Sequence, residues 1–179
     1  MSLSSQPSLA TLDELVQAFF QASAGEWQSQ RRYYTLKSDK TEEVMSQLTI
    51  QYLEPHCEEL QALEQLHHLE DGVTLTCGTL VTWESHYTSP SRKPATGSTI
   101  FGALDGLLYR DRGFATPKPI VATFDFRDAN TMRLRTEYNQ SCFEEELKLV
   151  GTQYRTRQTI ISRAGEEQMI GQYLEKRLA

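Results

Sequence analysis

Gly25-Glu-Trp-Gln-Ser-Gln-Arg-Arg-Tyr-Tyr34 marks the place where we expect a helix to end and the first strand of a barrel to begin. Gly25 can adopt the positive φ that ends a helix. Trp27 is large enough to fill one end of a barrel. The arginine and tyrosine pairs of Arg31–Tyr34 then begin a pattern with a period of two, which is typical of a β-strand. Most of the chain after this stretch has the same β pattern.

A helix is expected immediately before this stretch, over residues 11–23. Thr11 and Glu14 have the spacing of a capping box, in which each side chain bonds to the backbone amide of the other residue. Apolar residues recur at helical spacing and form one stripe, made of Leu12, Leu15, Val16, Phe19 and Phe20. Such a stripe needs an apolar partner. We therefore expect the helix to lie across one end of the barrel, and residues 1–10 to form a flexible segment.

The remainder of the chain reads as short strands joined by tight turns. Turn residues such as Asp128-Ala-Asn130 and Ala164-Gly165 separate them, and a helical insertion is expected over Pro55–Glu70. The expected strands are Arg31–Ser38, Val44–Leu53, Val73–His86, Ser98–Leu104, Leu107–Arg110, Lys118–Phe126, Thr131–Tyr138, Ser141–Leu149, Tyr154–Ser162 and Met169–Arg177. Nine or ten antiparallel strands suffice to close an up-and-down β-barrel over residues 29–177. We predict a mainly β, single-domain protein spanning residues 1–179.

Composition excludes several classes of function. The 179 residues include 18 basic and 24 acidic side chains, for a net charge of −6, which argues against a nucleic-acid partner. No segment has the features of a signal peptide or a membrane span, so we expect a cytoplasmic protein with no membrane partner. Cys57, Cys77 and Cys142 are odd in number and far apart, which favours neither a disulfide framework nor a metal site.

One predicted strand, Tyr154–Ser162, has no apolar face. Arg155 and Arg157 share one side of it, and a hairpin turn centred on Gly165 places them opposite Glu175 and Tyr173, respectively. Two interpretations are open. The charged side chains can face solvent as ordinary surface ion pairs. Alternatively they point inward, where burial requires either an anionic ligand or a bound carboxylate partner.

Several motifs together resemble a known family. Gly25-x-Trp27 at the start of the first strand is similar to the lipocalin signature. The longer run Phe19-Phe-x-x-Ser-Ala-Gly-x-Trp-x-Ser-Gln-Arg31, with Trp83, Arg155-Thr-Arg157 and Gly171-Gln-Tyr-Leu-Glu-Lys-Arg177, resembles the S-type (CpcS/CpeS) phycobiliprotein chromophore lyases. This resemblance covers nearly the whole chain. It implies a lipocalin-like or fatty-acid-binding-protein-like barrel.

The resemblance also implies a reaction. Such a lyase binds an open-chain tetrapyrrole (a bilin, here phycocyanobilin in the first instance) and attaches it through a thioether to a cysteine of an apo-phycobiliprotein subunit. The bilin is the substrate, so no cofactor and no metal are implied. A homodimer is compatible with this function. The alternative is a non-catalytic carrier of a bilin, lipid or other hydrophobic ligand, because the barrel alone fits a carrier equally well.

Site residues follow from the same resemblance. Arg31, Trp83 and Arg157 match positions that the family uses to handle the chromophore, and Arg155 is a weaker match. Tyr34 stands where many relatives have histidine, and a tyrosine can still donate a hydrogen bond there. Tyr173 is a candidate for stacking on the bilin. The motif does not identify an acid, and parity and proximity select Glu145 and Glu175 as candidate catalytic proton donors.

Overall fold

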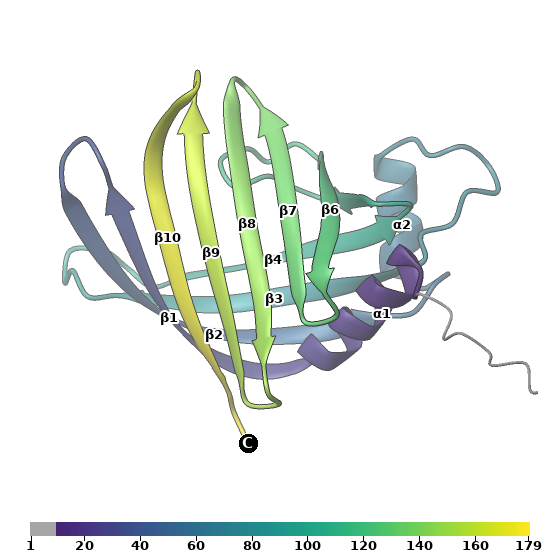
Figure 1. The fold of residues 1–179 in the computed structure, drawn as a ribbon, viewed down its shortest axis with the longest axis horizontal. Helices are drawn as coiled ribbons and strands as arrows, with labels where there is room; N and C mark the ends of the chain where they lie inside the picture. Colours follow the sequence, from purple (N-terminus) through teal and green to yellow (C-terminus); the bar gives the residue numbers. More distant parts are fainter. Residues whose placement is uncertain (1–9) are drawn as a thin grey trace, which may run out of the picture.

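A computed structural model describes residues 10–179 of the chain. The segment expected to be flexible, residues 1–10, lies almost wholly outside the described residues. Ten antiparallel strands form one closed barrel, with one helix at an end of the barrel and another on its outer side (Figure 1). The predicted fold class is confirmed. Neither helix in the described part of the chain is long and apolar enough to cross a membrane.

The strands follow one another around the barrel in chain order, and β1 pairs with β10 to close the sheet. This order leaves no free edge for another strand to join. The strands are β1 (Gly25–Thr35), β2 (Lys40–Leu53), β3 (Cys77–Tyr87), β4 (Ala95–Leu104), β5 (Leu107–Arg110), β6 (Ile120–Asp128), β7 (Thr131–Tyr138), β8 (Ser141–Val150), β9 (Tyr154–Arg163) and β10 (Glu166–Arg177).

The first strand begins earlier than the sequence pattern suggested. β1 starts at Gly25 rather than at Arg31, because Trp27 and Ser29 already point into the barrel. Gly25 has the predicted positive φ, of 129°. Trp27 is fully buried, and its indole Nε1 donates a hydrogen bond to the carbonyl oxygen of Ser23 (2.9 Å). The end of the helix and the start of the barrel are therefore joined by one buried side chain.

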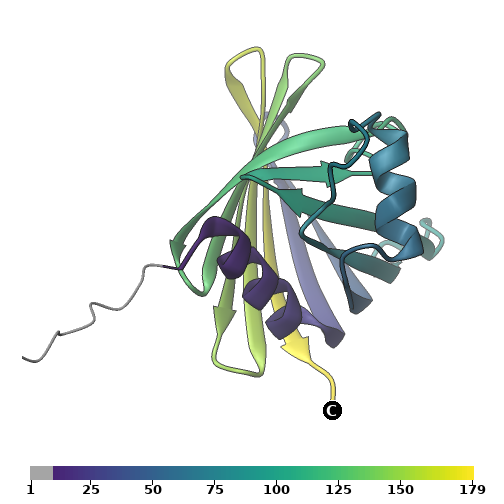
Figure 2. The ribbon, with the colours of Figure 1, turned by 90° about the vertical axis from the view of Figure 1, so that its right-hand side faces the viewer.

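The first helix, α1 (Leu12–Ser23), closes one end of the barrel (Figure 2). The predicted capping box is present, since Glu14 N donates to Thr11 Oγ1 (3.2 Å) and Thr11 N donates to the Glu14 carboxylate (2.8 Å). The buried face of α1 carries Val16, Phe19 and Phe20, which pack into the main hydrophobic core of the barrel. No helix of residues 10–179 covers the opposite end of the barrel.

The second helix, α2 (Glu58–Leu66), packs against the outer face of the barrel (Figure 2). It creates a second hydrophobic core, made of Leu53, Leu60, Leu63 and Leu75. Because Leu75 belongs to this outer core, the strand expected from Val73 begins only at Cys77. Gly102 permits the close approach: a Cβ atom there would lie 2.5 Å from a methyl group of Leu75.

The hairpin of β9 and β10 has the register that the sequence predicted. Arg155 pairs with Glu175 and Arg157 pairs with Tyr173. The tight turn at Ala164-Gly165 would by itself give a register one residue different, but a bulge between Glu167 and Met169 shifts the pairing. The bulge thus decides which residues face each other in the middle of the barrel.

Candidate functional site

The barrel encloses a cavity of about 390 Å³, a size typical of small-molecule sites. Its lining includes aliphatic, serine and threonine side chains together with two groups that can bind a conjugated anion. Eight are aromatic: Phe19, Phe20, Tyr33, Trp83, Tyr87, Phe101, Phe114 and Tyr173. Five are arginines: Arg31, Arg110, Arg112, Arg155 and Arg157. No aspartate or glutamate of the described residues is part of this lining, so its charged side chains are all cationic.

The two arginines of β9 point inward, which makes the solvent-facing interpretation of this hairpin wrong. The side chains of Arg155 and Glu175 are only 7% and 1% exposed. Arg155 Nε and Nη2 both donate to Glu175 Oε2, at 3.2 and 2.7 Å. The Arg155 guanidinium also lies 5.4 Å from the ring centre of Trp27. A carboxylate of the protein itself is therefore the partner that burial of Arg155 required.

Arg157 has a carboxylate partner on the other neighbouring strand. Its Nε donates to Glu145 Oε1 (3.0 Å), and its Nη2 donates to the same oxygen. Thr159 Oγ1 is a third donor to that oxygen, at 3.4 Å. Burial alone would lower the pKa of Arg157, but the attraction of Glu145 outweighs it and the pKa is raised. Arg157 is thus a permanent cation at the wall of the cavity.

Tyr173 lies between two arginines. The guanidinium carbons of Arg157 and Arg31 are 5.2 and 5.3 Å from its ring centre, and Tyr33 contacts it edge-on at 5.7 Å. Burial raises the pKa of Tyr173, and Arg157 offsets this only in part. The phenol therefore stays neutral at physiological pH and keeps its proton as a hydrogen-bond donor.

Arg31 lines the cavity without a carboxylate partner among the described residues. Its Nε donates to Ser29 Oγ (3.2 Å), one strand step below it. None of the ion pairs in residues 10–179 includes Arg31. Its charge is therefore available to a ligand.

Trp83 forms part of the same wall. A Cβ atom on Gly97 would lie 2.4 Å from the six-membered ring of the indole, so the ring occupies the space that a larger residue would fill. The guanidinium carbon of Arg112 lies 5.6 Å from the centroid of the ring. The indole therefore packs against Gly97 and has a cation near its ring.

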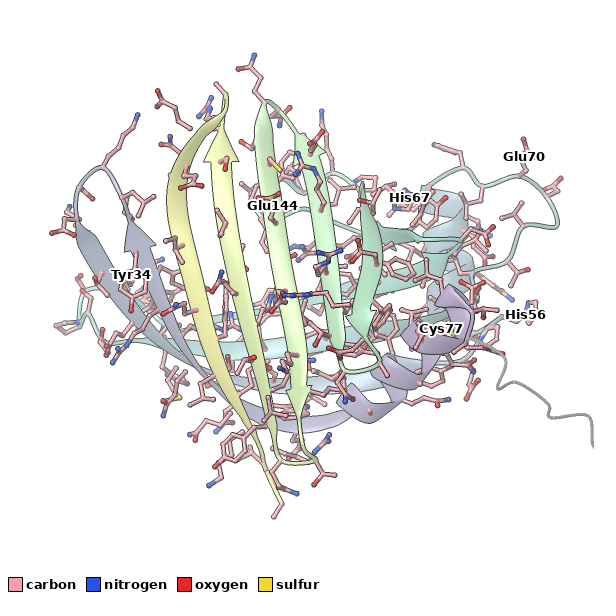
Figure 3. All side chains as sticks on the ribbon, in the orientation of Figure 1. Tyr34, His56, His67, Glu70, Cys77 and Glu144 are labelled. Atoms are coloured by element: carbon pink, nitrogen blue, oxygen red, sulfur yellow. The ribbon has the colours of Figure 1, made fainter. Side chains whose placement is uncertain are left out.

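Tyr34 lies on the opposite face of β1 from the cavity-lining side chains (Figure 3). The cause is the alternation of the strand, which directs Tyr33 inward and Tyr34 outward. Tyr34 hydrogen-bonds with Arg32, whose pKa it raises. The geometry therefore offers Tyr33, rather than Tyr34, to a molecule in the cavity.

Residues 15–178 match the protein family described as CpeS-like protein. The chain belongs to the CpeS-like family. The putative phycocyanobilin lyase CpcS 2 of a Nostoc species is 59% identical over 169 residues, which cover 94% of each chain. The putative chromophore lyase CpcV of a Picosynechococcus species is 53% identical over 171 residues, which cover 95% of this chain and 85% of that one.

A solved structure has the same fold as this CpeS-like chain. The S-type phycobiliprotein lyase CPES from Guillardia theta superposes with a TM-score of 0.78 at 22% identity, covering 92% of this chain and 93% of that chain. The family predicted from the sequence motifs and the enzyme class, a lyase, are both confirmed. The structural likeness adds independent support for the barrel.

The sequence motifs missed two arginines of this CpeS-like cavity, Arg110 and Arg112. Both follow the apolar Leu108 at steps of two, so the same parity rule that identified Arg155 and Arg157 could have found them. The guanidinium of Arg110 lies between two aromatic rings, 4.9 Å from the centre of Phe101 and 4.8 Å from that of Phe114. The four residues of β5 were too few to show the pattern.

The two carboxylates predicted as proton donors lie behind the cavity wall of the CpeS-like barrel. Glu145 and Glu175 are each buried and each accept hydrogen bonds from an arginine. In this arrangement a carboxylate acts as an acceptor and as a counter-charge. Either residue needs its arginine to move before it can donate a proton to a substrate.

Proposed function

We propose that the protein binds an open-chain tetrapyrrole in the barrel cavity and catalyses its thioether attachment to a cysteine of a phycobiliprotein subunit. Phycocyanobilin is the bilin that we propose first, because the relative at 59% identity is named a putative phycocyanobilin lyase. The composition of the cavity wall is the observation that carries the proposal. Aromatic rings suit a long conjugated ligand, and guanidinium groups suit its propionates.

The aromatic residues of the wall would hold the pigment. Trp83 and Tyr33 supply aromatic surface, and Tyr173, which two guanidinium groups cover, would contact the pigment through its edge and hydroxyl group. Arg31 stands next to Tyr173 with no carboxylate partner among the described residues, and it would bind one propionate. Holding the bilin in one extended conformation removes much of the entropic cost of the attachment reaction.

The Arg157–Glu145 pair would respond to the ligand. A propionate that approaches Arg157 competes with Glu145 for the same guanidinium nitrogens. Displacement would free the Glu145 carboxylate to accept hydrogen bonds from pyrrole nitrogens, or to take up a proton and deliver it to the bilin. The Arg155–Glu175 pair is more deeply buried than the Arg157–Glu145 pair, and it would keep its ion pair when the ligand binds.

The chemical step is the addition of a thiol across the ethylidene double bond of the bilin. The sulfur of the acceptor cysteine forms a bond to the exocyclic carbon, and the electron pair of the double bond moves into the ring and receives a proton. The thiol loses its own proton, so the sum of the reaction is an addition with no change of oxidation state and no leaving group. The nucleophile belongs to the acceptor, so this chain needs no covalent residue.

Reconstitution tests the proposal directly. The protein is incubated with phycocyanobilin and several apo-phycobiliprotein subunits, and covalent adducts are measured by mass spectrometry and by absorption under denaturing conditions. We expect one subunit to gain a thioether-linked bilin at a single cysteine, faster than in a reaction without the protein. An adduct yield equal to the spontaneous yield for every acceptor and every bilin would contradict the proposed activity.

A second candidate function is that of a pigment carrier. One observation favours it: both candidate acids are held in ion pairs, so no free carboxylic acid lines the cavity in the described residues. The same reconstitution separates the two functions. A carrier binds the bilin with a change in its absorption spectrum but leaves the rate of covalent attachment at its spontaneous value.

A further inference from the structure

Arg110 is an arginine at the cavity wall that forms no ion pair within the described residues. Its guanidinium Nε donates to Thr99 Oγ1 (3.0 Å), and its terminal nitrogens make no hydrogen bond within residues 10–179. The adjacent carboxylate, Asp111, is engaged elsewhere: its Oδ1 accepts from Thr99 Oγ1 (2.7 Å) and from Ile100 N (3.0 Å). No carboxylate in the described part of the chain lies within 4 Å of Arg110.

The electrostatic surroundings of Arg110 are unfavourable for a cation. Burial and the neighbouring Arg157 lower the pKa of Arg110 to about 10, and the carboxylates of Glu145 and Asp111 offset this only in part. Glu145 is bonded to Arg157 and Asp111 to Thr99, so neither forms an ion pair with Arg110. Such a site gains from any anion that enters the cavity.

Arg110 is nevertheless held firmly in place. The rings of Phe101 and Phe114 flank its guanidinium, at 4.9 and 4.8 Å. The backbone carbonyl oxygen of Arg110 lies 2.9 Å from Nε2 of His67, which follows α2 on the outer side of the barrel. The two rings and the hydrogen bond from Nε to Thr99 hold the guanidinium, and His67 holds the backbone of the same residue. The unbonded terminal nitrogens are therefore pre-oriented for a planar, two-oxygen partner.

We propose that Arg110 binds a carboxylate of the ligand, and that it is the anchor for the second propionate of the tetrapyrrole. The inference rests on the proposed bilin substrate, and it adds a binding residue that the sequence motifs do not include. Three arginines of the cavity lining, Arg31, Arg110 and Arg112, form no ion pair within residues 10–179. Arg31 and Arg110 are the two that we assign as anchors, because the Nε of each is held by a hydrogen bond, to Ser29 and to Thr99 respectively. Arg155 and Arg157 already have partners in Glu175 and Glu145.

The proposed role of Arg110 is tested by a double-mutant cycle in which the protein side chain and the carboxylates of the ligand are changed separately and together. Phycocyanobilin and its dimethyl ester are titrated by absorption against the wild-type protein and against Arg110→Gln, Arg110→Lys and Arg127→Gln. Arg127 is a matched control, because it is an exposed arginine that pairs with Glu146. Melting curves of each variant check that the fold is intact.

We expect Arg110→Gln to weaken binding of the free acid about 10- to 100-fold, which is the value of a charge-assisted hydrogen bond. Binding of the dimethyl ester should change by less than about twofold, because the ester has no anion for Arg110 to hold. Arg110→Lys should retain part of the preference for the free acid over the dimethyl ester, because lysine keeps the positive charge but lacks the two parallel N–H donors of a guanidinium. Arg127→Gln should behave like the wild type with both ligands.

Other outcomes would overturn the assignment. If Arg110→Gln weakens binding of acid and ester equally, Arg110 has a structural role and the proposed bilin site remains. If it changes neither, Arg110 does not contact a carboxylate. If the wild-type protein binds neither the acid nor the ester, the proposed function itself fails, and the inference about Arg110 fails with it.

Discussion

Arg155 on β9 and Glu175 on β10 face each other across the hairpin. Two nitrogens of the Arg155 guanidinium, Nε and Nη2, donate hydrogen bonds to the same carboxylate oxygen, Oε2 of Glu175. The second oxygen, Oε1, is buried and has no hydrogen-bond partner among the described residues. Arg155 is therefore the sole neutralising partner of Glu175 in the described chain. The pair lies against Trp27, at the end of the barrel that α1 closes.

This geometry predicts a large effect of Glu175→Gln on stability. The substitution leaves the Arg155 guanidinium buried without a counter-charge, which typically costs about 3–5 kcal/mol. For a protein of this size we expect the melting temperature to fall by about 6–20 °C. Calorimetry or thermal unfolding followed by circular dichroism measures the change.

The matched control removes both charges. Arg155→Met combined with Glu175→Leu replaces the pair by apolar side chains, which is often neutral for stability. We expect the double variant to melt closer to the wild type than Glu175→Gln does. A double variant that is less stable than the single variant would mean that the pair itself, rather than charge compensation, stabilises the barrel.

The Arg157–Glu145 pair is predicted to matter for the reaction. We expect Glu145→Gln to bind phycocyanobilin but to transfer it about 100-fold more slowly, because removal of a general acid typically costs a factor of this order. Single-turnover transfer to an apo-subunit gives the rate, and absorption titration gives the affinity. If Glu145→Gln and Glu175→Gln both transfer at the wild-type rate with the same product spectrum, positioning alone must account for the activity.

Gly97 is predicted to control the orientation of Trp83. In Gly97→Ala, the new methyl group would meet the indole at 2.4 Å, so the ring must move away from the wall and toward the cavity. We expect a changed near-UV circular dichroism spectrum, weaker bilin binding and a loss of stability of about 1–3 kcal/mol. Adding Trp83→Phe should restore the stability, because the smaller ring leaves room for the methyl group. An unchanged spectrum and affinity would show that Trp83 does not depend on Gly97.

The three cysteines are predicted to differ in reactivity. Burial raises the pKa of Cys77 to about 12, so at pH 8 only about one molecule in 10⁴ carries the reactive thiolate. Burial also raises the pKa of Cys57 and Cys142, but both side chains are partly exposed. Labelling of the native protein with a thiol reagent should therefore modify Cys57 and Cys142 first, and Cys77 only after unfolding.

The same experiment reports on the end of the barrel that α1 closes. Cys77, which is labelled in Figure 3, belongs to the same hydrophobic core cluster as Val16 and Phe20 of α1. Raising the pH toward 12 should accelerate its labelling only if α1 opens, because the thiolate must also be reached by the reagent. Rapid labelling at pH 8 would contradict a closed end. The Cys57→Ser/Cys142→Ser variant should transfer bilin normally, since the nucleophile belongs to the acceptor.

Much of the fold could be predicted because the signals were local. The capping box of Thr11 and Glu14, the turn residues and the two-residue period each depend on neighbours in the chain, and these predicted α1 and nearly every strand. The register of β9 and β10 was also predicted correctly. The start of β1 was not, because the polar Ser29 and Gln30 hide the alternation that Trp27 begins.

Less of the site than of the fold could be predicted from the sequence. The reason is that the sequence does not always show which face of a strand points into the barrel. Alternation separates two faces, but when neither is apolar, as in β9, it does not say which one points inward. Local patterns in the sequence were sufficient to identify the family, the barrel and the pairing of Arg155 with Glu175. The tertiary structure was needed to show that this face lies inside, that Arg157 is paired with Glu145 on the adjacent strand β8, and that Arg110 forms no ion pair within the described chain. The physical reason is that the period of two separates the faces of a strand, whereas the curvature of the whole closed sheet decides which face points into the barrel.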